Sequence, residues 1–163
     1  MVSPLEVQRS RTYPVAVAEA FAILLPAPLE DLFRHRYGPI PPIQGVSGQD
    51  GPWASVGQTR VIHLAGGGTM REELTAVEAP KEFRYRITDL TGPLKVLAIS
   101  VDGAWRLEPA GTGATITWRW TVHPASSVAA VAMPVFGRLW QGYAALALTE
   151  LDGVLLPPPL TRG

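Results

Sequence analysis

Glu72 is the side chain in this sequence best suited to transfer a proton or to anchor a polar group. It shares strand parity with Met70 and Leu74, so we expect it to point toward the apolar interior. A carboxylate there needs a cationic or hydrogen-bonding partner, or its pKa rises. A three-residue glycine turn places Arg60 diagonally close to Glu72, whereas a two-residue turn makes His63 the neighbour.

Two interpretations of Glu72 and its neighbour, Arg60 or His63, remain open. Either pair could anchor the polar end of a ligand, and Glu72 or Tyr85 could shuttle a proton while Arg60 steadies an enolate. The plainer interpretation is a satisfied buried ion pair, or a Glu72 that faces solvent after a one-residue slip of its strand. Glu72, Arg60 and Tyr85 are thus the candidate catalytic residues, and the sequence does not decide whether the protein is an enzyme.

Other chemistry-bearing patterns in the sequence are incomplete. His35, His63 and His123 lie on different expected elements without ligand spacing, so we expect no metal site and no cofactor. The chain has no cysteine, which excludes disulfides and thiolate nucleophiles. Gly45-Val46-Ser47-Gly48-Gln49 lacks the last glycine of a nucleophile elbow, and no Lys-Ser/Thr follows Gly66-Gly67-Gly68, which excludes a phosphate loop.

The charge balance excludes several classes of partner. Fourteen basic and fourteen acidic residues among 163 give a net charge of zero, so we expect no nucleic-acid partner. The longest apolar stretches, 15–25 and 128–148, are interrupted by charged residues and proline, whereas a membrane span needs about 20 apolar residues. We therefore expect a cytoplasmic protein without a membrane span.

Alternating and helical patterns predict the elements that position these side chains. Residues 5–13 alternate as a strand, 15–24 and 29–33 have helical spacing, and 38–43 is too proline-rich for either. Strands are predicted over 58–65, 69–77, 83–87, 97–105 and 115–123, before a helical period at 126–151 in which Pro134 ends a short leading turn. This order predicts an α+β fold in which the terminal helix crosses one face of an antiparallel sheet.

The predicted register gathers aromatic side chains on the inner face of that sheet. A loop at 110–113 pairs Trp105 with Trp118 and Gly103 with Trp120, and a loop at 79–82 places Leu74, Ala76, Phe83, Tyr85 and Ile87 on the same face. The terminal helix supplies a facing apolar stripe of residues spaced three and four apart: Ala132, Val135, Phe136, Leu139, Trp140, Tyr143, Leu146 and Ala147. If the curved sheet and the helix leave a gap, the residues expected to bind a ligand there are Met70, Glu72, Tyr85, Ile99, Val101, Trp105, Trp118, Trp120, Phe136, Leu139, Trp140 and Tyr143.

Several segments together suggest a family. They are Thr12-Tyr13-Pro14 before an Ala-rich helix, Gly57-Gln58-Thr59-Arg60-Val61, Arg71-Glu72-Glu73-Leu74, Phe83-Arg84-Tyr85-Arg86-Ile87 and Gly111-Thr112-Gly113-Ala114-Thr115-Ile116-Thr117-Trp118. On these fold signatures, residues 5–152 resemble the START-like (SRPBCC) superfamily, which includes polyketide cyclases, lipid-transfer domains and tree-pollen allergens. The resemblance implies a helix-grip fold: six to seven strands wrapped on the C-terminal helix, with two short helices between the first two strands, and a hydrophobic cavity between sheet and helix.

The expected function follows from that cavity. It is binding or transport of a hydrophobic small molecule, such as a lipid, a quinone or a polyketide-like compound. An enzyme resembling polyketide cyclases and dehydratases is the first alternative. A homodimer that uses Ala144, Ala145 and Leu148 on the helix exterior is the second. We expect one ligand-binding domain over residues 1–156 and a flexible proline-rich tail over 157–163.

Overall fold

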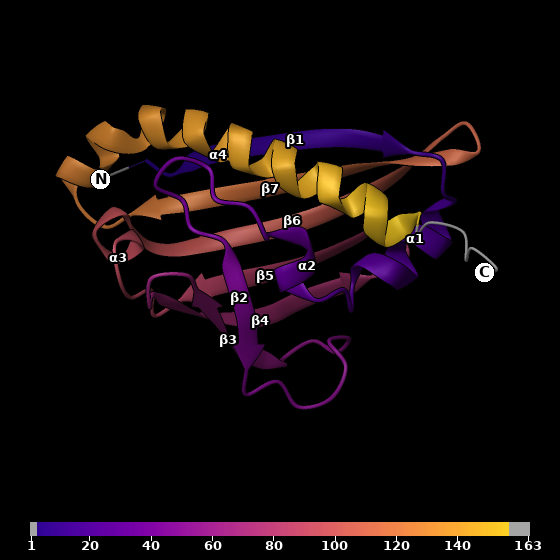
Figure 1. The fold of residues 1–163 in the computed structure, drawn as a ribbon, viewed down its shortest axis with the longest axis horizontal. Helices are drawn as coiled ribbons and strands as arrows, with labels where there is room; N and C mark the ends of the chain where they lie inside the picture. The colour runs from indigo at the N-terminus through magenta and orange to yellow at the C-terminus, as the bar shows by residue number, and fades with distance from the viewer. Residues whose placement is uncertain (1–2, 157–163) are drawn as a thin grey trace, which may run out of the picture.

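The computed structural model describes residues 3–156, which form an antiparallel sheet of seven strands and four helices (Figure 1). In chain order the elements are β1 (Leu5–Tyr13), α1 (Val17–Leu24), α2 (Leu29–Leu32), β2 (Ile43–Ser47), β3 (Thr59–Leu64), β4 (Thr69–Glu78), β5 (Glu82–Thr88), α3 (Leu94–Leu97), β6 (Ala98–Ala110), β7 (Gly113–Pro124) and α4 (Ser127–Leu155). The strand order across the sheet is β1-β7-β6-β5-β4-β3-β2. The predicted α+β helix-grip fold is confirmed, including the two short helices between β1 and β2.

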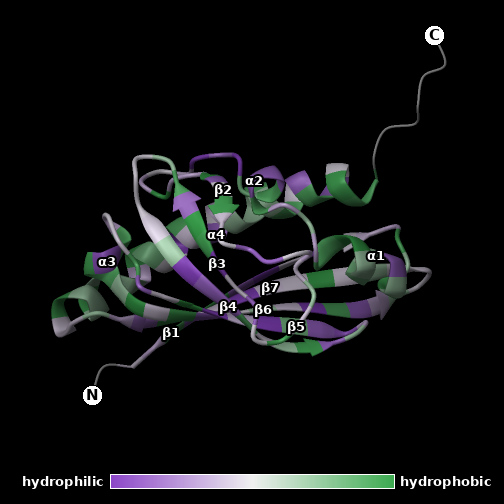
Figure 2. Ribbon diagram, turned by 90° about the horizontal axis from the view of Figure 1, so that it is seen from below, coloured by the Kyte–Doolittle hydropathy of each residue, from purple (hydrophilic) through white to green (hydrophobic). Residues whose placement is uncertain are grey.

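The helices lie on one face of the sheet. In Figure 1, α4 crosses this face beside β1, and α2 sits between α4 and β2; both sets of contacts are present. Figure 2 shows hydrophobic and hydrophilic residues alternating along the central strands, as expected when only one face is covered. The outer face carries the charged side chains, so any apolar pocket must lie beneath the helices.

Local sequence accounts for α4. The Ser126 side chain accepts a hydrogen bond from the Ala129 backbone N–H at 3.1 Å and caps the helix. The helix continues through Pro134 in one piece, so the predicted break there is wrong. Val135, placed on the buried stripe from the sequence, is 64% exposed. No helix within residues 3–156 is long and apolar enough to cross a membrane.

The hairpin of β6 and β7 has the predicted register. Trp105 lies opposite Trp118 and Gly103 opposite Trp120, so the aromatic side chains share the inner face. Two of the β-bulges in the sheet reverse the inward–outward alternation that the sequence predicts. One near Ala98 turns Ile99 outward, where it is 66% exposed, so its predicted place in the pocket is wrong.

The second bulge lies in β4, between Leu74 and Ala76. It leaves Ala76 opposite the outward-facing Arg84 and lets Val77 pair with Phe83. The predicted inward position of Ala76 is therefore wrong, and Val77 packs against the core in its place.

The glycine turn settles which residue faces Glu72. The Leu64 N–H donates to the Gly68 carbonyl at 2.8 Å, so the loop is Ala65-Gly66-Gly67, displaced by one residue from the predicted Gly66-Gly67-Gly68. Gly66 and Gly67 adopt positive φ angles of 92° and 97°. As a result Arg60 lies directly opposite Glu72. His63 instead shares a hydrogen bond with the Ser47 hydroxyl.

Two residues of α4 that were expected to form a dimer contact are buried. Ala144 and Leu148 are only 0% and 2% exposed, because this side of α4 packs into the core, so they cannot form an exterior contact surface. Strand β2 and helix α3 were not predicted from the sequence. The predicted tail at 157–163 lies outside the described residues.

Candidate functional site

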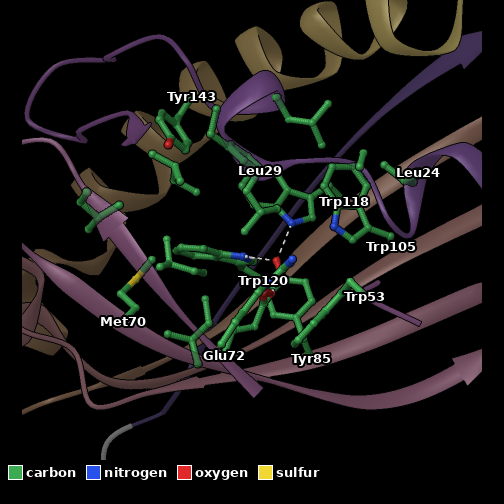
Figure 3. A pocket seen from close by; sticks show the side chains of 18 of the residues that line it. Leu24, Leu29, Trp53, Met70, Glu72, Tyr85, Trp105, Trp118, Trp120 and Tyr143 are labelled. Carbon is green, nitrogen blue, oxygen red and sulfur yellow. Dashed lines mark hydrogen bonds and ion pairs between the residues drawn. The ribbon is translucent and has the colours of Figure 1, made fainter. Parts of the chain in front are cut away.

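The main pocket lies under a cover that we call the roof, which consists of α2 and residues 33–43 (Figure 3). The inner faces of β3 to β7 form its floor. The volume of this pocket is about 60 Å³. The lining is mainly apolar and aromatic: Leu24, Leu25, Ala27, Leu29, Leu32, Phe33, Ile40, Pro41, Ile43, Trp53, Arg60, Ile62, Leu64, Met70, Glu72, Phe83, Tyr85, Ile87, Leu94, Trp105, Trp118, Trp120 and Tyr143.

The space between the sheet and α4 is filled, which corrects the predicted position of the cavity. The Trp118 and Trp140 rings lie 4.7 Å apart between centroids, and Trp120 is 6.2 Å from Trp140. Trp140 is fully buried. From α4 only Tyr143 reaches the pocket. The pocket therefore lies beside this contact, where the roof replaces α4 as the opposite wall.

A buried ion pair forms one end of the pocket. Arg60 Nε donates to Glu72 Oε1 at 2.7 Å, and Arg60 Nη2 is 3.4 Å from Glu72 Oε2. Arg60 Nη1 donates to Gln49 Oε1 at 3.1 Å. The guanidinium carbon lies 3.9 Å from the ring centroid of Trp53, within cation–π distance. Arg60 and Glu72 are only 5% and 3% exposed, so Glu72 faces inward as predicted.

The electrostatics of this pair limit its chemistry. Burial raises the pKa of Glu72, and the opposing positive charge and hydrogen bond of Arg60 lower it. Because two nitrogens of Arg60 face the Glu72 carboxylate, the positive charge is already compensated. The pair can orient the polar end of a ligand, and Glu72 can exchange a proton, but Arg60 offers little free charge for a bound anion.

Tyr85 is held by two indole groups on the floor. Its hydroxyl oxygen accepts hydrogen bonds from Trp118 Nε1 and Trp120 Nε1, each at 2.8 Å (Figure 3). The ring lies over Gly103, the residue opposite it on β6, where an added Cβ would stand 2.0 Å from Tyr85 Cζ. Burial raises the pKa of Tyr85 above its ordinary value, so the hydroxyl stays neutral. Glycine at this position makes room for the ring.

The roof is fixed to α4 by two tyrosines. The Tyr143 hydroxyl donates to the Pro41 carbonyl at 3.1 Å, and the Tyr143 ring stacks on Phe33 with centroids 5.7 Å apart. The Tyr37 ring packs on Gly142, where an added Cβ would come within 2.0 Å of it. Tyr37 and the proline-rich loop after it are thus docked on α4.

The structure divides the predicted ligand-binding residues into two groups. Those that line the pocket are Met70, Glu72, Tyr85, Trp105, Trp118, Trp120 and Tyr143. Val101, Phe136 and Trp140 are buried in the core away from it, Leu139 packs against the core, and Ile99 faces outward. Of the candidate catalytic residues, Glu72, Arg60 and Tyr85 all reach the pocket.

Sequence reasoning missed the side chains of the roof and Trp53. Trp53 is 2% exposed although it follows Gly51-Pro52 in a segment without periodicity. A tryptophan in such a segment was the available signal, because a large aromatic side chain there needs a place to be buried. The helical spacing of residues 29–33 includes Phe33, but this spacing does not show which part of the sheet the Phe33 ring packs over.

A second group of titratable side chains lies on the outer face of the sheet. Asp102 Oδ1 accepts from Arg86 Nε at 2.9 Å, and Asp102 Oδ2 is 2.9 Å from His123 Nε2. Burial acts to raise the pKa of Asp102, but the hydrogen bonds and charges of Arg86 and His123 lower it below its ordinary value. Within residues 3–156, no three His, Asp or Glu side chains gather as metal ligands.

Comparisons with known proteins agree with this fold. A family model described as "Polyketide cyclase / dehydrase and lipid transport" matches residues 4–155. The ginseng major latex-like protein 151 from Panax ginseng has a similar structure, with a TM-score of 0.70 and 13% identity over 95% of this chain and 99% of its own.

Two further solved structures are similar. Ara h 8.0201 has a TM-score of 0.67 and 20% identity, over 95% of this chain and 99% of that chain. A protein from Arthrobacter aurescens has a TM-score of 0.69 and 19% identity, over 95% of this chain and 88% of its own. A search of curated proteins gives no match.

Proposed function

Because the chain belongs to the polyketide cyclase / dehydrase and lipid transport family, within the START-like superfamily, we propose that it binds or transports a hydrophobic small molecule beneath the roof. A lipid, a quinone or a polyketide-like compound has the required chemistry. We propose that residues 1–156 act as one ligand-binding domain. One observation carries the proposal: the apolar, aromatic lining of the pocket includes one compensated ion pair and the hydroxyl groups of Tyr85 and Tyr143, of which the Tyr143 hydroxyl already donates to the Pro41 carbonyl.

The size of the pocket sets a condition on binding. The pocket volume of about 60 Å³ is smaller than the roughly 300–1,000 Å³ of ordinary ligand sites. A ligand of more than a few heavy atoms therefore requires the roof to move outward. Helix α2 has only four residues, too short for a helix that is stable by itself. Such a segment is the least costly part of the pocket wall to displace.

The test uses α-methylstyrene, a small apolar probe, titrated while tryptophan fluorescence is recorded. We expect saturable binding of one molecule per chain. Leu32→Ala should tighten binding, because Leu32 lines the pocket and its truncation adds space there. Leu151→Ala is the matched control, since Leu151 is fully buried but not part of the lining. Absence of saturable binding in both the wild type and Leu32→Ala, or an equal effect of the two variants, contradicts the proposal.

A cyclase or dehydratase activity is the second candidate, and the burial of Glu72 beside the pocket favours it. A carboxyl whose pKa is raised by burial is suited to proton transfer. The discriminating experiment measures aldol cyclisation of a synthetic poly-β-ketone. If Glu72 is the proton-transfer group, Glu72→Gln abolishes turnover and leaves probe binding intact. Equal turnover by the wild type, the variant and buffer rejects this candidate.

Dimerisation stays a prediction, although Ala144 and Leu148 of the face expected for it are buried. The exposed apolar side chains of α3, β6 and the first half of α4 lie elsewhere, at Val96, Ile99, Val128, Val131 and Val135. Light scattering at high protein concentration tests for a dimer, and a monomer throughout rejects it.

A further inference from the structure

The Tyr85 hydroxyl has only one hydrogen-bonding role left. A phenolic oxygen accepts up to two hydrogen bonds and donates one. Both acceptor positions are taken by the indole N–H groups of Trp118 and Trp120, at 2.8 Å each. No acceptor for the hydroxyl proton is found among residues 3–156. The group therefore offers a single donor among the lining residues, and Figure 3 shows its oxygen joined to both indole groups.

The surroundings keep this donor in one orientation. Tyr85 lies on Gly103, where any Cβ would collide with the ring, so the ring occupies a space that the strand leaves open for it. Trp118, which donates to the hydroxyl, is itself packed between Trp105 and Trp140, at centroid distances of 5.4 Å and 4.7 Å. Hydrogen bonds accepted by a hydroxyl polarise it and strengthen the one that it donates. A donor fixed in this way discriminates between ligands better than a freely rotating one.

We propose that Tyr85 is the specificity-determining residue of the pocket and selects hydrophobic molecules that carry an uncharged oxygen acceptor, of the ketone or quinone carbonyl class. This inference rests on the proposed function, because it names the ligand chemistry of the same pocket. When a hydrocarbon of equal shape binds, it displaces water and leaves the Tyr85 hydroxyl proton without an acceptor. This costs binding free energy.

The preference for an uncharged acceptor follows from the ion pair. Arg60 is the one cation among the described lining residues, and Glu72 already compensates its charge. A carboxylate or phosphate ligand would enter an apolar space beside Glu72 without a free positive charge, which is unfavourable. A ketone or quinone oxygen needs only one donor, and Tyr85 provides it.

The experiment compares two isosteric probes, acetophenone and α-methylstyrene, which differ by C=O against C=CH₂. Dissociation constants are measured for the wild-type protein and for Tyr85→Phe. The variant removes the acceptor of the Trp118 and Trp120 N–H groups, and the α-methylstyrene series reports this structural effect because the hydrocarbon cannot accept from them. We expect acetophenone binding to weaken by about tenfold more than α-methylstyrene binding, as for one hydrogen bond of ordinary strength. Equal changes for the two probes overturn the inference.

A second measurement needs no variant and covers the case in which Tyr85→Phe does not fold. Acetophenone labelled with ¹³C at the carbonyl is bound to wild-type protein, and both the carbonyl carbon and the indole N–H protons are observed by NMR. We expect a downfield carbonyl shift and shifts of the Trp118 and Trp120 indole protons. A bound carbonyl whose shift equals that in hydrocarbon solvent overturns the inference while the proposed function stands. If neither probe binds, the proposed function fails as well.

Discussion

Removing the positive charge of Arg60 tests the energetics of the pocket most strongly. Arg60→Met leaves the Glu72 carboxylate buried, with 3% of the residue exposed and no cation beside it. Breaking a buried ion pair by removing one partner costs about 3–5 kcal/mol of unfolding free energy. For a chain of this size, that loss lowers the melting temperature by roughly 10 °C.

The loss of unfolding free energy in Arg60→Met depends on pH, and the pKa of Glu72 determines whether the loss grows or shrinks as the pH rises. Burial raises this pKa from its ordinary value of 4.5, and Arg60 is the influence that opposes the rise. In Arg60→Met the folded-state pKa is therefore higher than in the wild type. When folding raises the pKa of a carboxyl group, its contribution to stability is fully present below the pKa of the unfolded state. That contribution is lost as the pH rises through the pKa of the folded state. The variant should thus lie closer to the wild type at pH 5 than at pH 8.

Urea unfolding followed by circular dichroism at both pH values gives the numbers. Arg71→Met is the control, because Arg71 is an exposed cation on β4 and its loss should change stability by less than about 0.5 kcal/mol. The double variant Arg60→Met/Glu72→Met should regain most of the loss, since apolar residues replace buried charges well. A loss below about 1 kcal/mol in Arg60→Met, or the same loss at both pH values, would refute the reasoning.

Substitution of two glycines that contact tyrosine rings gives two further predictions. Gly103→Ala should destabilise the fold by about 1–3 kcal/mol in thermal unfolding, because its Cβ would stand 2.0 Å from the Tyr85 ring. Gly142→Ala should displace the Tyr37 ring, which also lies 2.0 Å from the position of the new Cβ. Its effect is faster hydrogen exchange of the Ile40 amide, which donates to the Tyr37 carbonyl at 3.0 Å, with a small change in stability because alanine favours the helix.

Matched controls are available for both substitutions. Gly45→Ala and Gly153→Ala add a Cβ with no atom within 4 Å, in β2 and α4 respectively. Gly45→Ala should leave the melting temperature nearly unchanged, and Gly153→Ala should leave Ile40 exchange unchanged. If each control behaves like its test variant, contacts of the new Cβ with Tyr85 and Tyr37 do not cause the lower stability or the faster exchange.

The sequence predicted the parts of the fold that depend on local periodicity and on turns. The pairing of Trp105 with Trp118 followed from the loop at 110–113, and the inward direction of Glu72 followed from its parity with Met70. Ile99 and Ala76 were misplaced because each lies at a β-bulge, where one extra residue reverses the alternation. No local pattern marks either bulge.

The position of the pocket could not be predicted because it depends on contacts between distant segments. The sequence showed aromatic side chains on the sheet and on the last helix, but not that Trp118 and Trp140 would pack together and fill the space between them. The roof includes residues 38–43, a proline-rich stretch with neither a helical nor a strand period. Their position is set by the Tyr143–Pro41 hydrogen bond and by the packing of Tyr37 on Gly142.

Methyl resonances of the two described methionines show directly whether a ligand binds beneath the roof. Met70 lines the pocket, whereas Met133 is buried in the core away from it. With ¹³C-methyl methionine labelling, adding acetophenone should shift the Met70 methyl resonance and give cross-peaks between that methyl group and the probe. The Met133 resonance should not move. Contacts of the probe with Met133, or none with Met70 at saturating probe, would show that the ligand does not bind beneath the roof.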